Sequence, residues 1–397
     1  LRFEETGAFT TTGNYTTASG GTTAIGQSSS TLVIGGTFTQ ESDSVLNVTL
    51  GASPDITATS AQLDGTLVVN GFTDIGSAPT TASDAMSLQY ILLRTTDGIT
   101  GDFDNNPLIS TGLDYLLHDG HVTNGNLDYE LGFRLAWTEG GQNGGTGSFT
   151  IHEGTAFDVD VVLSDQAIPP GDFASGWDGS SLEKNGLGRL VLSEVNTYTG
   201  TTTVNDGVLQ TTINDSFADS SDVIVNIGGI LDLDGTNQTA NRLSSDVSGG
   251  GGITLNGGVL TADSSSGDST FSGVISDGSI AGGGLIHEGS GGTLSLTGDN
   301  TYAGATTNRA DSILQIGNGT TTGSLASSSI SNEGTLIFNG NDDSIYEGTL
   351  SGTGELIKDG EGILTLSGAG SSQSSVEVKG GTLSFTQTGP FTTTGNY

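Results

Sequence analysis

Residues 182–209 read LEKNGLGRLVLSEVNTYTGTTTVNDGVL, and this stretch decides the fold. Short runs of aliphatic and β-branched residues, at 187–192, 201–204 and 208–209, are each bounded by Gly, Asn or Asp. Because Gly, Asn and Asp favour turns, the runs between them predict short strands. The stretch therefore indicates a coil of chain that runs briefly, turns and runs again.

The same stretch occurs twice more. Residues 285–314 read LIHEGSGGTLSLTGDNTYAGATTNRADSIL, and residues 356–383 read LIKDGEGILTLSGAGSSQSSVEVKGGTL. Repetition at a spacing of tens of residues is typical of solenoids, in which each repeat buries its apolar face only by stacking on its neighbours. The repeats therefore predict an all-β solenoid.

The composition favours ordered strands over disorder. Of 397 residues, 66 are Gly and only 32% are hydrophobic, which alone is typical of a disordered chain. The apolar residues nevertheless alternate with other residues, as in Leu294/Leu296 and Leu364/Leu366. Alternation at period two is the pattern of half-buried strands.

The charge excludes two classes of partner. The formal net charge is −36, and the 9 basic residues are spread singly along the chain. Nucleic acids and anionic membrane surfaces are bound by clustered Lys and Arg, so neither is expected as a partner. The absence of Cys fits a chain that crosses an oxidising compartment.

The two ends of the sequence match each other. Residues 1–15 (LRFEETGAFTTTGNY) and 383–397 (LSFTQTGPFTTTGNY) are identical at 11 of 15 positions, from Leu1 to Leu383 an offset of 382 residues. The sequence has no initiator Met. We therefore expect a piece of a longer protein in which a unit of about 382 residues occurs in tandem, with residues 383–397 beginning the unit again.

Three segments of the chain differ in composition and in predicted strand pattern. Residues 1–44 read as the end of a preceding β-helix repeat. Residues 45–175 contain 10 of the 24 aromatic residues and the longer predicted strands, at 87–94 and 127–137. The Ile-Pro-Pro-Gly sequence at 168–171 is the expected joint to the repeats. Residues 176–397 are predicted to form Gly-punctuated β-helix, with repeat copies near 182–209, 285–314 and 356–383.

The repeats resemble a known family. The pattern Gly-x-Gly-x-Leu-x-Leu-x-x-x-Asn-Thr-Tyr-x-Gly-x-Thr-Thr, at 186–203 and with one variation at 289–307, is similar to the passenger-associated repeat of bacterial autotransporters. The third copy replaces Asn-Thr-Tyr by Ala-Gly-Ser at 369–371. Residues 90–103 resemble the autochaperone region of such passengers. The resemblance implies a right-handed parallel β-helix with an autochaperone-like β module, residues 45–175, stacked in line.

The repeat corners are the candidate site residues. We expect Asn196 and Asn300 to stack in corner ladders, and Tyr198 and Tyr302 to cap the apolar interior. A functional alternative is that the adjacent Thr-rich corners form a polar contact face for another copy. The predicted corner glycines are Gly186, Gly188, Gly200, Gly291, Gly304, Gly360 and Gly362.

Catalytic and metal sites find little support in the sequence. It contains no nucleophile elbow, Walker A loop, dinucleotide-binding fingerprint or HExxH motif. His118 and His121 are close enough to suggest a metal pair, but the stretch reads as a turn. The pairs Asp232/Asp234 and Asp158/Asp160 would each share a strand face, a spacing compatible with the two carboxyls about 5 Å apart that a retaining glycosidase needs. Oxygen ligands at 232–237 and 102–106 could bind calcium; otherwise no cofactor and no catalytic residue are predicted.

These observations lead to three hypotheses. The first, supplied by the resemblance, is a repeat segment of an extracellular, surface-displayed bacterial adhesin or fibre that mediates cell–cell or cell–surface adhesion and biofilm formation. Its partners would be further copies of itself, or a surface glycan or matrix protein, and an outer-membrane barrel would lie elsewhere in the parent chain. The second is a purely structural sheath or filament repeat. The third is a carbohydrate-active β-helix enzyme; we expect a chain that is not an enzyme.

Overall fold

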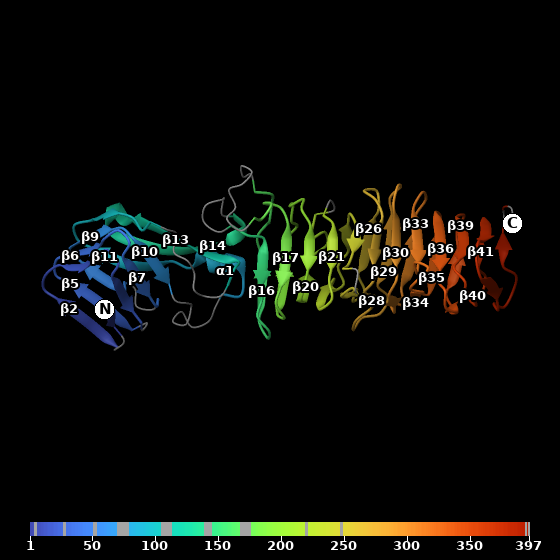
Figure 1. The fold of residues 1–397 in the computed structure, drawn as a ribbon, viewed down its shortest axis with the longest axis horizontal. Helices are drawn as coiled ribbons and strands as arrows, with labels where there is room; N and C mark the ends of the chain where they lie inside the picture. The colour runs from blue at the N-terminus through green and yellow to red at the C-terminus, as the bar shows by residue number, and fades with distance from the viewer. Residues whose placement is uncertain are drawn as a thin grey trace. The chain divides into compact units, whose positions relative to one another are not determined.

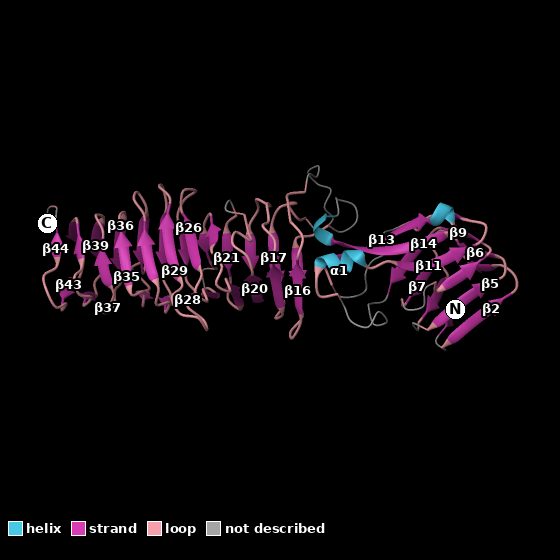
Figure 2. Cartoon of the chain, turned by 180° about the vertical axis from the view of Figure 1, so that it is seen from behind, coloured by secondary structure: helices cyan, strands magenta, loops and turns pink. Residues whose placement is uncertain are grey.

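The computed structural model describes residues 1–3, 6–26, 29–50, 54–69, 79–104, 113–138, 145–166, 176–218, 221–246, 249–393 and 395. The predicted joint at 168–171 lies outside these residues. The chain forms two compact units, the first of Leu1–Thr150 with Gln166–Gly179 and the second of Ile151–Asp165 with Ser180–Tyr397. Strands dominate both units, and short helices occur only in unit 1 among the described residues (Figure 2).

Unit 1 begins as a three-sided solenoid. Each coil contributes one strand to each of three parallel sheets, because short β-patterned runs alternate with turns along the chain. The first sheet contains β1 (Arg2–Phe3), β4 (Thr22–Ile25), β7 (Val45–Val48) and β10 (Thr66–Val69). The second contains β2 (Gly7–Thr11), β5 (Ser30–Ile34), β8 (Ile56–Ala58) and β11 (Tyr90–Thr95), and the third β3 (Tyr15–Thr17), β6 (Thr37–Gln40), β9 (Ser60–Leu63) and β12 (Ile99–Gly101).

The later part of unit 1 departs from this regular pattern. Strands β13 (Leu116–Thr123) and β14 (Asp128–Leu135) form an antiparallel hairpin around the 3₁₀ turn η1 (Asn124–Asn126), and β14 pairs antiparallel with β11. A second 3₁₀ turn, η2 (Ala136–Thr138), follows, and β15 covers Ser148–Thr150. The strand predicted at 127–137 covers 128–135, and its alternating residues Tyr129, Leu131, Phe133 and Leu135 are buried in the core.

A short helix precedes β11 and corrects one predicted boundary. The strand predicted at 87–94 begins only at Tyr90, because Ser87 ends helix α1 (Ala82–Ser87). Thr81 caps the helix: its side chain accepts a hydrogen bond from the backbone N–H of Asp84. The buried Ala82 and Ala85 give the helix its packed face.

Unit 2 is built from successive coils of parallel strands, seen side by side in Figure 1. One sheet contains β16 (Ala156–Val159), β18 (Arg189–Leu192), β20 (Gly207–Thr211), β22 (Gly229–Asp232), β25 (Gly252–Thr254) and β28 (Val274–Ser276). A second contains β17 (Leu182–Asn185), β19 (Thr202–Val204), β21 (Val223–Val225) and β24 (Leu243–Ser244). A third contains β23 (Gln238–Ala240), β26 (Val259–Asp263), β29 (Gly284–Glu288), β32 (Ala305–Asn308), β35 (Ser329–Asn332) and β38 (Thr349–Ser351).

The remaining strands complete the later coils of unit 2. A fourth sheet contains β27 (Ser269–Phe271), β30 (Thr293–Leu296), β33 (Ile313–Ile316), β36 (Thr335–Asn339), β39 (Glu355–Asp359) and β42 (Ser375–Val378). Smaller sheets pair β31 (Asp299–Asn300) with β34 (Ser324–Leu325), β37 (Ser344–Tyr346) with β40 (Ile363–Leu366) and β43 (Thr382–Phe385), and β41 (Ser372–Gln373) with β44 (Thr392–Thr393).

Ladders of aliphatic side chains form the core. The strand register aligns Leu190, Leu209, Leu231, Ile253 and Ile275 in five successive coils of unit 2, and all five are fully buried. Each coil exposes one apolar edge that the next coil covers, so stacking supplies the hydrophobic stabilisation that a single coil lacks. The predicted all-β parallel solenoid is confirmed. No described helix is long and apolar enough to cross a membrane.

Candidate functional surface

The Asn-Thr-Tyr asparagines join three consecutive coils of unit 2. The side-chain oxygen of Asn196 accepts a hydrogen bond from the backbone N–H of Leu163, at 2.7 Å, in the preceding coil. Its side-chain nitrogen donates to the carbonyl of Ser216, at 2.6 Å, in the following coil, and to that of Glu194 in its own. Asn300 repeats the arrangement with the N–H of Ile275 and with the carbonyls of Ser324 and Gly298. Because both side chains are almost completely buried, they act as structural ties.

The two tyrosines of the same motif lie inside the solenoid. Tyr198 and Tyr302 are fully buried, and each hydroxyl pairs with the hydroxyl of the threonine four residues later, Thr202 at 2.7 Å and Thr306 at 2.6 Å. Burial raises the pKa of both phenols far above the ordinary value, so both stay neutral. Neither tyrosine is available to a ligand at the surface.

The predicted corner glycines lie in bends between strands. Gly186 has a φ of +71°, in the left-handed region, and a Cβ there would collide with the carbonyl of Ile151 in the preceding coil. Gly200 lacks room for a different reason, since a Cβ would come within 2.5 Å of the carbonyl carbon of Ser180. The other predicted positions are also in bends: Gly188, Gly291, Gly304, Gly360 and Gly362.

The third copy makes part of the asparagine tie with a serine. The hydroxyl of Ser371 accepts from the N–H of Leu350 in the preceding coil, at 3.1 Å, and donates to the carbonyl of Gly368, at 2.8 Å. It therefore reproduces the acceptor half of the asparagine side chain, which explains how this copy tolerates the loss of Asn-Thr-Tyr.

Sequence reasoning missed a buried basic residue that occupies the same position in all three copies. Lys184, His287 and Lys358 follow the first leucine of their copies by two residues, and all three are buried. The Lys184 ammonium donates to the carbonyls of Asn185, Gly186 and Asp206, at 2.8, 2.6 and 2.9 Å. Burial lowers the pKa of Lys184 to about 8, against the opposite effect of the Asp206 charge. The sequence signal for this buried position was its spacing of two residues from a leucine, because residues two apart on a strand lie on the same face.

His287 belongs to a buried chain of polar side chains. Asn308 donates to Asn332 Oδ1 at 2.7 Å, which leaves its Oδ1 facing His287 Nδ1 at 2.9 Å. His287 Nδ1 therefore carries the proton, and Nε2 accepts from the hydroxyl of Ser264 at 3.0 Å. Asn332 continues the chain to Gln373 at 2.6 Å. Burial lowers the pKa of His287, so the imidazole is held neutral.

A row of hydroxyls faces outward from one side of unit 2. The register of β23, β26, β29, β32, β35 and β38 aligns the outward residues of six successive coils. We call this the hydroxyl row: Thr239, Thr261, Ile286, Thr307, Ser331 and Ser351. Neighbouring members are about 4.8 Å apart because they lie on paired strands. The row carries no charge, in a chain whose net charge is −36.

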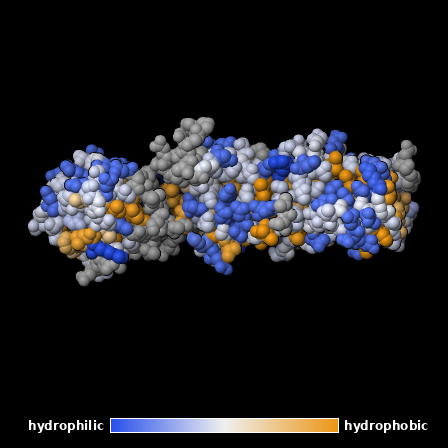
Figure 3. Space-filling model, in the orientation of Figure 1, coloured by the Kyte–Doolittle hydropathy of each residue, from blue (hydrophilic) through white to orange (hydrophobic). Residues whose placement is uncertain are grey.

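Five of the six members of the hydroxyl row carry a hydroxyl, and Ile286 is the exception. The face of unit 2 seen in Figure 3 mixes hydrophilic and hydrophobic residues and shows no single extended apolar patch. A regular array of donors and acceptors can bind a partner through many weak hydrogen bonds, each worth about 1 kcal/mol. Of the Thr-rich corners considered from the sequence, Thr307 lies in the row, whereas Thr306 is buried beneath it.

Neither acidic pair lies within a single strand. Asp232 ends β22, whereas Asp234 lies in a turn with a φ of +46°, so the two do not share a strand face as predicted. Asp232 instead accepts hydrogen bonds from Gln210 at 3.1 Å and Asn256 at 2.8 Å, in the coils on either side. Asp160 likewise follows the end of β16, so it does not share that strand with Asp158.

The metal alternatives have equally little support. His118 and His121 lie within strand β13, which corrects the prediction of a turn. The calcium candidate at 102–106 lies partly outside the described residues. Within its described part, Asp102 accepts a hydrogen bond from the hydroxyl of Tyr129 at 2.8 Å. Among the described residues, no group of three or more His, Cys, Asp or Glu side chains is placed to hold a metal ion.

Comparison with known proteins agrees with this architecture. The family model of the passenger-associated-transport-repeat matches residues 182–210, 290–307 and 356–385. Over 232 residues, 55% of this chain, the sequence is 31% identical to the adhesin BmaC autotransporter of Brucella suis biovar 1 (strain 1330). The matched region spans only 6% of that relative. The chain is therefore a β-solenoid that carries three passenger-associated-transport-repeat segments and is similar, over about half of its length, to an autotransporter adhesin.

Proposed function

We propose that this chain is a segment of a secreted, surface-displayed bacterial adhesin, and that the hydroxyl row is its contact surface for cell–cell or cell–surface adhesion. Passenger repeats and the similarity to an adhesin autotransporter support surface display. The hydroxyl row is the observation that carries the contact role, because it offers an uncharged, regularly spaced array on six consecutive coils.

The acidic surface limits how such a contact forms. Two copies with a net charge of −36 each repel one another, and salt screens this repulsion over about 8 Å at physiological ionic strength. Contact through an uncharged row keeps carboxylates out of the centre of the interface. A glycan partner, which is rich in hydroxyls and uncharged, would meet the row with even less repulsion.

Unit 2 offers a matched pair of faces for the test. Thr261, Ile286 and Thr307 are consecutive outward positions of the hydroxyl row. Thr293, Ile313 and Thr335 are consecutive outward positions on the sheet of β30, β33 and β36. Thr261→Glu with Thr307→Glu therefore adds the same charge, with the same spacing, as Thr293→Glu with Thr335→Glu.

The experiment displays the chain on bacterial cells and measures sedimentation of the cells and their retention on glycan- or matrix-coated surfaces. The hydroxyl-row variant is expected to lose adhesion, while the variant on the other sheet keeps it at equal surface expression. If both variants adhere like the wild type, the hydroxyl row is not the contact surface. If the wild type neither clumps cells nor binds either coating, a structural filament repeat replaces the adhesin proposal.

A further inference from the structure

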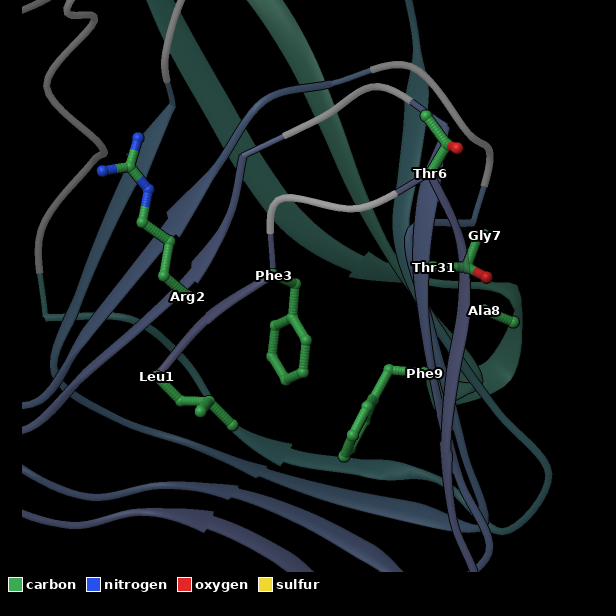
Figure 4. Close-up of a pocket in the computed structure, with 8 residues that line it drawn as sticks. All are labelled: Leu1, Arg2, Phe3, Thr6, Gly7, Ala8, Phe9 and Thr31. Atoms are coloured by element: carbon green, nitrogen blue, oxygen red, sulfur yellow. The ribbon is translucent and has the colours of Figure 1, made fainter.

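The N-terminal coil of unit 1 has an open apolar face. Leu1, Phe3 and Phe9 point into a cavity of about 580 Å³, while Arg2 points away from it (Figure 4). Leu1 is 68% exposed and Phe9 46% exposed. The opposite side of the same coil is covered, since β1 pairs with β4 and places Phe3 opposite Ile25. This coil therefore has one stacked neighbour in the structure and one uncovered face.

The coil that begins at β43 repeats this coil and shows the opposite face covered. Residues 383–397 match residues 1–15, and β43 pairs in parallel with β40, which places Leu383 opposite Leu364 and Phe385 opposite Leu366. The ring centroids of Phe385 and Phe391 are 4.7 Å apart with an interplanar angle of 45°. The corresponding values for Phe3 and Phe9 are 4.8 Å and 48°.

The two coils thus have the same internal arrangement and complementary neighbours. Phe385 has a preceding partner, Leu366, and is 45% exposed. Phe3 has a following partner, Ile25, and borders the open cavity. The two coils are identical at 11 of 15 positions and share the geometry of this ring pair, so we expect them to stack in the same way. The strand that precedes one coil then identifies the strand that the other coil accepts.

We propose that the N-terminal face binds the strand Ile363–Leu366 of a second copy of residues 1–382. The strand would lie parallel to β1, with Leu364 opposite Leu1 and Leu366 opposite Phe3. The pairing of β41 with β44 adds a second contact, since Ser372 and Gln373 lie opposite Thr392 and Thr393. These two threonines correspond to Thr10 and Thr11. Leu383–Phe385 of one copy and Leu1–Phe3 of the next are then the same strand, with a neighbouring strand on each side.

The chemistry of the two surfaces fits this junction. Two leucines would cover the apolar side chains that now border the cavity, and burying apolar area is the main favourable term in such contacts. β1 is the terminal strand of its sheet, so a strand added beside it would extend that sheet with the parallel ladder that β40 and β43 already form. Arg2 would lie opposite Thr365, so the register places no two like charges opposite one another in this strand pair.

The test is a tandem protein in which residues 1–382 are followed directly by residues 1–397, compared with the single chain. Hydrogen exchange of peptides covering residues 1–11 of the second copy is followed by mass spectrometry. We expect their amides to exchange at least 100-fold more slowly than the same amides of the single chain. Equal exchange rates in the two proteins would overturn the proposal.

Two variants test the register. Inserting one Gly between the copies leaves both sequences intact but reverses which side chains face the first copy, so protection of residues 1–11 should be lost. Leu364→Asp with Leu366→Asp in the first copy should also remove the protection, whereas the same pair in the second copy should leave the junction protected. Protection that survives both the insertion and the first-copy substitution would refute the proposed register.

Discussion

Replacing Asn196 with Ala is expected to loosen three coils of unit 2 at once. The substitution leaves the N–H of Leu163 and the carbonyl of Ser216 without their amide partner, and both groups lie in buried contacts. An unsatisfied buried backbone group costs about 1–3 kcal/mol, so the two together cost about 2–6 kcal/mol. The carbonyl of Glu194 adds little, because Glu194 is exposed and water can replace the lost donor.

The loss should appear locally, because a solenoid is stabilised by nearest-neighbour contacts. Native-state hydrogen exchange of peptides around Leu163 and Ser216 should accelerate by about 30-fold or more, since each 1.4 kcal/mol corresponds to a factor of ten. Peptides in unit 1 should exchange at unchanged rates. Asn196→Ser should lie in between, because Ser371 already makes the acceptor half of the tie in the third copy.

Glu194→Ala is the matched control. It lies two residues away on the exposed side of the same bend, where substitutions usually change stability by less than about 0.5 kcal/mol. The reasoning fails if Asn196→Ala and Glu194→Ala give the same exchange rates around Leu163 and Ser216. Asn196 would then be a buried side chain with no role in holding the coils together.

Three further predictions follow from the buried groups and the charge. Tyr302→Phe removes the hydroxyl pair with Thr306 and should lower the unfolding free energy measured in urea by about 1 kcal/mol; no change would show that Thr306 finds another partner. Burial lowers the pKa of His287 in the folded chain, so the unfolded chain binds a proton at this histidine first as the pH falls below about 6.5. The free energy of unfolding should therefore decrease below this pH. His287→Gln should flatten this dependence in acid titrations of unfolding. Self-association measured by light scattering should strengthen as NaCl rises from 20 to about 300 mM, because salt screens a net charge of −36 per copy; weakening with salt would indicate contact between opposite charges instead.

The solenoid could be predicted because its signals are local and repeated. Period-two alternation placed Leu294 and Leu296 in the core, and the structure buries both. The glycine-bounded runs fixed the positions of turns to within a few residues, although β18 begins at Arg189 rather than at Leu187. Helix α1 was missed because six residues are too few for a 3.6-residue pattern to stand out from the surrounding chain.

The polar interior was harder to predict. Lys184 and Lys358 look like surface residues by type, and only their spacing from Leu182 and Leu356 places them inside. Their partners are backbone carbonyls of neighbouring turns, which carry no sequence signal. The prediction that Asp232 and Asp234 share a strand was wrong for a different reason: the strand ends at Asp232, and Asp234 lies in the turn that follows.

Buried polar ties and aliphatic ladders together explain how a chain with only 32% hydrophobic residues forms ordered coils. A ladder such as Leu190–Leu209–Leu231 favours stacking, but it would tolerate a shift of two residues along the strands, since the same face would still be apolar. The side chains of Asn196, Asn300 and Lys184 contact specific backbone groups of adjacent coils and turns, so a shifted register would leave them unpaired in the interior. Hydrophobic burial therefore drives stacking, and the cost of unpaired polar groups selects one register. The same division of roles leads us to expect that the register between consecutive copies is set by polar pairing at Ser372 and Gln373 as much as by Leu364 and Leu366.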